Sequence, residues 1–92
     1  MRVRYHGKHW NPNDDTWSCK IGKEGVLKQI RIFETESSWG HHTGSAIVIF
    51  DCDGSLMTPF LDNLEPADKE AEILFVKIKL GVYSDAKGTI EL

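Results

Sequence analysis

The segment Ile73–Tyr83, ILFVKIKLGVY, most constrains the fold, because it combines a long apolar run with a two-residue period. One parity of the segment is wholly apolar and consists of Leu74, Val76, Ile78, Leu80 and Val82. Such alternation is typical of a strand with one buried face, and β-branched residues lose rotamer freedom in a helix. We therefore expect a central strand from Ile73, preceded by a short helical turn over Pro66–Glu72.

A helix over residues 64–80 is the alternative. Apolar residues also recur there at helical spacing, at Leu64, Ala67, Ala71, Leu74 and Ile78. Acidic Asp68 and Glu70 come first and Lys77 and Lys79 come last, which is the order that a helix dipole favours. The sequence leaves both interpretations of residues 64–80 open and favours the strand.

The remaining apolar segments indicate further short strands between polar turns. We expect strands at Met1–Tyr5, Thr16–Ile21, Val26–Glu34, Ser45–Phe50 and Thr89–Leu92, with Leu56–Leu64 an irregular segment or edge strand. The last strand is expected to follow a turn at Ser84–Gly88 and to close a terminal hairpin with the strand from Ile73. Leu27 and Phe33 break the parity of their strand, which predicts either a bulge or a strand that is covered on both sides. A chain of 92 residues makes one domain, 1–92. The predicted fold class is mainly β (β-rich α+β): a single small antiparallel sheet or barrel of five to six short strands with one short helical turn.

Charge is segregated along the chain. Residues 1–33 hold seven Lys/Arg and three Asp/Glu, a net +4, whereas residues 34–72 hold one Lys and nine acids, a net −8. Such polarity bears on partners and association rates. Cations and an aromatic ring that suit phosphates and bases open the chain, at Arg2, Arg4, Lys8 and Trp10. An acidic set that suits a basic partner follows later, at Asp62, Glu65, Asp68, Glu70 and Glu72. Trp39, in a second polar loop over Thr35–Ser45, is a candidate anchor for a partner.

The segment Ile47–Leu56, IVIFDCDGSL, carries the best motif for chemistry. It resembles the first motif of the haloacid dehalogenase superfamily, a hydrophobic strand that runs into D-x-D-G-T/V-L. The resemblance implies Asp51 as nucleophile, Asp53 as general acid/base and Mg²⁺-dependent phosphotransfer. It covers about ten residues, and about 37 residues follow Ser55, whereas that family needs a parallel sheet with crossover helices.

The sequence predicts no metal site, no disulfide and no membrane span. The histidine pairs His6/His9 and His41/His42 lack a zinc-site spacing, so we expect no metal and no cofactor. Cys19 and Cys52 are expected as reduced thiols in or near the core. No run of about 20 apolar residues and no secretory signal occur, so we expect no membrane contact and a cytoplasmic location, the host cytoplasm if the gene is a phage gene. The oligomeric state stays open.

These observations together favour a small intracellular, non-enzymatic binding module that inhibits a nucleic-acid-processing protein or ribonucleoprotein complex. In its small size, acidity and lack of a catalytic set, the chain resembles the general class of immunity proteins and phage anti-defence proteins, anti-CRISPR proteins included. The expected partner is a protein or ribonucleoprotein with a basic surface. The alternative is a nucleic-acid-binding small barrel that uses the basic, aromatic N-terminus. A Mg²⁺-dependent phosphotransfer enzyme that uses Asp51 and Asp53 ranks third.

Overall fold

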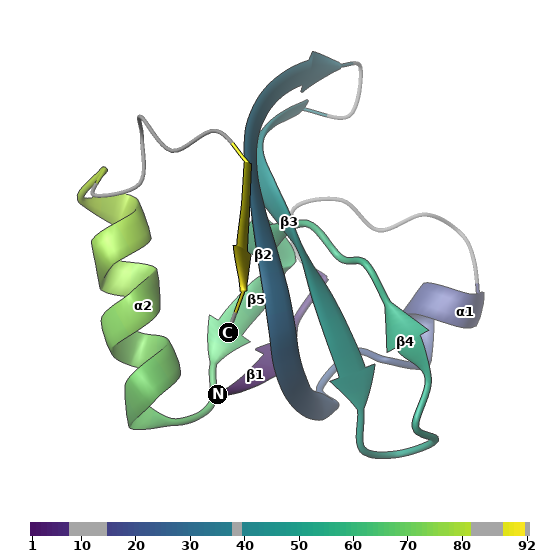
Figure 1. Ribbon diagram of the computed structural model, residues 1–92. Helices are drawn as coiled ribbons and strands as arrows, with labels where there is room; N and C mark the ends of the chain where they lie inside the picture. Colours follow the sequence, from purple (N-terminus) through teal and green to yellow (C-terminus); the bar gives the residue numbers. More distant parts are fainter. Residues whose placement is uncertain (8–14, 38–39, 82–87, 92) are drawn as a thin grey trace.

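The computed structural model describes residues 1–7, 15–37, 40–81 and 88–91, and these fold around one antiparallel sheet (Figure 1). The strands are β1 Arg2–Tyr5, β2 Glu24–Ser37, β3 Gly40–Phe50, β4 Leu56–Met57, β5 Leu64–Pro66 and β6 Gly88–Glu91. The helical elements are α1 Asp15–Ser18, the 3₁₀ turn η1 Leu61–Asn63 and α2 Lys69–Lys79. The predicted fold class is confirmed.

Strand β2 is the centre of the sheet. The strands follow the order β4-β3-β2-β1-β5, and β6 pairs with β2 beyond the end of β1. The β2–β3 register shifts between Leu27 and Gln29, which confirms the predicted bulge. The bulge explains how Leu27 and Ile30, of opposite parity, are both buried on one face.

The core lies on one face of the sheet. Its strand residues are Val3, Tyr5, Leu27, Ile30, Ala46, Val48, Phe50 and Leu64. Every described helical element adds apolar side chains to this same core: Trp17 from α1, Leu61 from η1, and Ala71 and Leu74 from α2. The Cα trace is accordingly thin, 35 × 32 × 17 Å. The other face of the sheet receives none of these side chains.

The predicted central strand from Ile73 is wrong, because most of that segment lies in helix α2. The side chain of Asp68 accepts a hydrogen bond from the backbone N–H of Ala71, which caps the helix. Gly81 adopts a φ of +78° directly after the C-cap residue Leu80, a conformation that glycine adopts without strain. The helical turn expected over Pro66–Glu72 is also shifted, since Pro66 still belongs to β5.

Three other local predictions are corrected. Thr16–Ile21 is not a strand, since Asp15–Ser18 is helical and turns follow it. The polar segment Thr35–Ser45 is mostly strand, because β2 extends to Ser37 and β3 begins at Gly40. The two strands pair as far as Ser37 and Gly40. The C-terminal strand β6 exists but pairs with β2 instead of with the segment that became α2.

The cysteine prediction is confirmed in one respect and wrong in another. Neither Cys19 nor Cys52 takes part in a disulfide, as expected. Both are exposed, however, and neither lies in the core. Among the described helices, none has the length and apolar character needed to cross a membrane.

Candidate binding surface on the open face of the sheet

The face of the sheet opposite the core is the strongest candidate surface, and we call it the open face. Strand residues that lie directly opposite each other in a ladder point to the same face. Arg2 pairs with Val26, Val26 with Ile49 and Ile49 with Leu56, whereas Arg4 pairs with Glu24 and Glu65. The open face therefore carries two adjacent rows: an apolar row Val26–Ile49–Leu56 that ends at Arg2, and a charged row Glu65–Arg4–Glu24.

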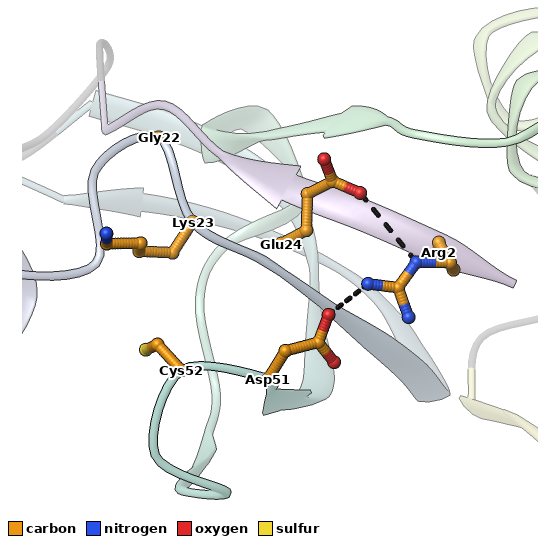
Figure 2. A pocket seen from close by; sticks show the side chains of 6 residues that line it. All are labelled: Arg2, Gly22, Lys23, Glu24, Asp51 and Cys52. Atoms are coloured by element: carbon orange, nitrogen blue, oxygen red, sulfur yellow. Dashed lines mark hydrogen bonds and ion pairs between the residues drawn. The ribbon is translucent and has the colours of Figure 1, made fainter.

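The two arginines of β1 are each bound to two carboxylates of the same chain. Arg2 forms ion pairs with Asp51 and, at 3.7 Å, with Glu24 (Figure 2). Arg4 forms ion pairs with Glu24 at 3.0 Å and with Glu65 at 3.4 Å. Three carboxylates thus face two guanidinium groups, so this network carries a net charge of −1.

The neighbouring carboxylates raise the pKa of both arginines. The hydrogen bond from Arg2 to Asp51 raises the pKa of Arg2, and the hydrogen bonds from Arg4 to Glu24 and Glu65 raise the pKa of Arg4. Both guanidinium groups therefore stay charged at any physiological pH. Carboxylates of the same chain offset the charge of both guanidinium groups, so these groups attract a phosphate less strongly.

A shallow depression adjoins the network, where the turn after β3 meets the start of β2 (Figure 2). It is lined by Arg2, Gly22, Lys23, Glu24, Asp51 and Cys52. Figure 2 shows Arg2 between Glu24 and Asp51, with the Lys23 side chain extending away from the network. The depression is therefore bordered by the ion-paired Arg2, Glu24 and Asp51, and Lys23 lies at its edge.

The two carboxylates of the Asp51–Ser55 turn have separate partners. Asp51 pairs with Arg2, whereas Asp53 pairs with Lys20 and accepts hydrogen bonds from the backbone and hydroxyl of Ser55. The bond from Lys20 and those from Ser55 hold the pKa of Asp53 well below its usual range. The sheet around this turn is antiparallel in every described pair, not parallel as the dehalogenase resemblance implies. The two acids of the D-x-D-G motif, Asp51 and Asp53, thus each form an ion pair with a different cation of the fold.

Lys20 is the residue that sequence reasoning missed. It is only 4% exposed, and its ammonium lies 5.6 Å from the centre of the Phe50 ring, within range of a cation–π contact. Its pKa is raised, chiefly by the hydrogen bond to Asp53. Lys20 therefore joins the turn after α1 to the turn after β3. The sequence offered no signal for this pair, because the two residues lie 33 positions apart.

The acidic candidates do not form one patch. Glu65 joins the charged row of the open face, and Asp62 lies half-buried in η1. Asp68 accepts bonds from the backbone N–H groups of Ala71 and Arg2, so it holds α2 against β1. Glu70 and Glu72 are exposed on α2, but residues two positions apart on a helix are rotated by about 200° and point to opposite flanks.

The structure brings Arg2, Arg4 and Glu65 together and places the other described candidates elsewhere. Lys8, Trp10 and Trp39 lie outside the described residues. His41 and His42 are neighbours on β3, and no group of three or more metal-ligating side chains occurs within residues 1–7, 15–37, 40–81 and 88–91.

Comparisons of the chain with models of protein families, with curated protein sequences and with solved structures found no match.

Proposed function

We propose that the protein is a small binding module that occupies a basic protein surface through the open face of its sheet. The observation that carries the proposal is the state of Arg2 and Arg4, each of which is bound to two carboxylates in a network of net negative charge. Beside this network, Leu56 leaves 61% of its surface exposed at the end of the apolar row. An apolar patch with a charged border is the usual composition of a protein interface.

A basic surface large enough to bind this face is typical of proteins that handle nucleic acid, because they neutralise phosphates with Lys and Arg. We therefore propose an inhibitor that covers such a surface on a nucleic-acid-processing protein or ribonucleoprotein complex. Direct nucleic-acid binding through Arg2 and Arg4 is less well supported, since their carboxylate partners would have to be displaced by phosphate. Phosphotransfer by Asp51 and Asp53 is also less well supported, since the two carboxylates are held by different cations.

The test is chemical cross-linking of the tagged full chain in cells that express it, followed by mass spectrometry. We expect cross-links from Lys23, at the edge of the open face, to a nucleic-acid-processing protein. Leu56→Arg should reduce this capture at least about tenfold, because a cation would face the basic partner and an apolar contact would be lost. Val76→Arg, a similarly exposed residue on α2, is the matched control and should leave the capture unchanged.

A second measurement separates the alternative. Fluorescence anisotropy with DNA and RNA oligonucleotides at physiological salt should give no binding below about 100 μM, the upper end of the range for non-specific binding. Binding of an oligonucleotide at about 1 μM would contradict the proposal and favour the nucleic-acid-binding function. Equal loss of capture in Leu56→Arg and Val76→Arg would move the interface away from the open face.

A further inference from the structure

Helix α2 carries apolar side chains on two opposite sides. Ala71 and Leu74 are buried in the core, and Phe75 and Ile78 pack against it. On the other side, Ile73, Val76 and Leu80 are exposed by 51%, 55% and 76%. Figure 1 shows this helix standing beside the sheet, with its outer side facing away from every other described element. A surface helix needs only one apolar side to join the core, so the second side is in excess of what this fold requires.

The outer apolar side has the spacing of a coiled-coil seam. Ile73, Val76 and Leu80 are separated by three and four residues, which is the alternation that keeps a stripe facing one partner helix. At about 100° per residue, the stripe lies opposite the buried side. We call Ile73, Val76 and Leu80 the outer stripe.

The charges beside the outer stripe indicate which helix would fit it. Glu70 and Lys77 lie along one flank of the stripe, and Glu72 and Lys79 lie along the other. On both flanks the acid is in the N-terminal half of the helix and the lysine in the C-terminal half. A second copy of α2 laid antiparallel on the first would pair Ile73 with Val76 of the second copy. Each glutamate would then face a lysine of the second copy, because the two helices run in opposite directions.

A parallel arrangement fits the same charges less well. It would gather the glutamates of both copies at one end of the pair and the lysines of both copies at the other. The helix dipoles would also be aligned side by side, instead of being opposed as they are in the antiparallel pair. The outer stripe and its flanks are therefore self-complementary in the antiparallel sense, which is what an interface between identical subunits requires.

We propose that the chain forms a symmetric dimer in which the outer stripes of two α2 helices pack antiparallel. One helix of this length buries less than the roughly 800 Å² per partner of a standard interface, so we expect a weak dimer that forms at high protein concentration. The open face lies on the other side of the sheet from the core, so it is separate from the outer stripe. The dimer therefore does not depend on the proposed function.

The first test is sedimentation equilibrium of the full chain from about 5 μM to 1 mM. We expect the mass to rise from that of one chain to that of two. Val76→Arg should weaken the dimer at least about tenfold and keep the circular dichroism spectrum of the wild type. Leu56→Arg, on the open face, is the matched control and should dimerise normally. A wild-type chain that stays monomeric at 1 mM overturns the proposal, as does a dimer that Val76→Arg leaves intact.

The second test addresses the charges. Glu70→Lys with Glu72→Lys makes both flanks basic, and Lys77→Glu with Lys79→Glu makes them acidic. Each double variant alone should be monomeric at concentrations where the wild type dimerises, because like charges then meet across the interface. An equimolar mixture of the two should form a heterodimer. A mixture that stays monomeric, with both variants folded, overturns the proposed charge pairing.

Single cysteines then decide the direction of the helices, in a background with Cys19→Ser and Cys52→Ser. In the antiparallel pair, residue 69 lies beside residue 80 of the second copy and about 16 Å along the axis from its own counterpart. Oxidation should form a disulfide between chains in a mixture of Lys69→Cys and Leu80→Cys. Lys69→Cys by itself should form no disulfide between chains. Efficient cross-linking of Lys69→Cys to itself would overturn the antiparallel arrangement.

Discussion

The segments Ser45–Phe50 and Ile73–Lys79 have similar apolar sequences, but the first forms a strand and the second a helix. Both are rich in isoleucine, valine and phenylalanine, SAIVIF in one case and ILFVKIK in the other. The first lies in β3, where Ala46, Val48 and Phe50 are buried at alternate positions. The second lies in α2, where Leu74 is buried and its neighbour Ile73 is exposed. Apolar content therefore decides that a segment packs, but not in which secondary structure.

The difference between the two segments lies in what flanks them. Helix α2 begins at a carboxylate that caps its first turn, has glutamates near its start and lysines near its end, and is followed by a glycine with positive φ. Strand β3 instead pairs with β2 on one side and with β4 on the other. These end signals favour the helix and oppose the low helix propensity of β-branched residues, which costs a few tenths of a kcal/mol per residue.

The largest effect should come from breaking the strand. Val48 is fully buried in β3, so Val48→Asp would place an unpaired carboxylate in the core. We expect a loss of several kcal/mol, comparable to the whole stability of a small domain. Urea unfolding followed by circular dichroism measures this loss. Ile49→Asp, one residue along on the open face, is the control and should remain folded. Equal tolerance of both changes would mean that the parity of β3 is inverted.

The buried side of the helix should be the next most sensitive. Leu74→Ala leaves a cavity under α2 and should cost about 2–4 kcal/mol. This corresponds to a fall in melting temperature of roughly 10 °C or more. Ile73→Ala, at the adjacent exposed position, should change stability by about 0.5 kcal/mol or less. Thermal unfolding of these variants and of Val76→Ala distinguishes a helix from a strand, because a strand would bury Leu74 and Val76 on the same face, whereas the helix exposes Val76.

The cap of α2 should contribute less than its packing. Asp68→Ala removes the acceptor for the N–H groups of Ala71 and Arg2 and should cost about 1 kcal/mol. Asp68→Asn keeps one oxygen acceptor for the N–H of Ala71, but its amide NH2 cannot accept from the N–H of Arg2, so it should restore only part of the loss. The measurement is the free energy of unfolding together with the helical signal at 222 nm. A wild-type value for Asp68→Ala would show that packing alone holds the segment helical.

The turn that ends β3 should respond to acid. The pKa of Asp53 is lowered in the folded state, so its ionised form stabilises the fold above the ordinary carboxyl pKa of about 3.9. That contribution is lost as the pH falls from this value toward the lowered pKa. The carboxylate is half exposed, so solvent screening keeps the effect below that of the cap. The stability difference between wild type and Asp53→Asn should shrink below about pH 4. A pH-independent difference would contradict this assignment.

The smallest effect should be a gain. Val76→Ala replaces an exposed β-branched residue in a helix and should stabilise the dilute, monomeric chain by about 0.5 kcal/mol. Ile47→Ala, in β3, should destabilise the chain instead, because a strand favours β-branched residues. Chemical denaturation below about 5 μM avoids any contribution from the dimer. Loss of stability in Val76→Ala would show that the outer stripe is covered within one chain.

The candidate surface was predictable in part. The strand expected at Met1–Tyr5 is present, and its alternation places Arg2 and Arg4 on one face and the buried Val3 and Tyr5 on the other. The partners of those arginines were not predictable, because Glu24, Asp51 and Glu65 come from three distant segments. The charge totals of the thirds of the chain were also misleading, since sheet pairing places acidic residues beside basic ones.

The sequence by itself determined the strand-rich class and the first strand, and it indicated the bulge in β2 as one of two interpretations. These features depend on residues within a few positions of one another, where periodicity and turn chemistry act. Only the tertiary structure decided between helix and strand for Ile73–Lys79, the pairing of β6 with β2, and the burial of Lys20 against Asp53. Each of these depends on which surfaces meet, and the free energy of that contact is larger than the local propensities that oppose it.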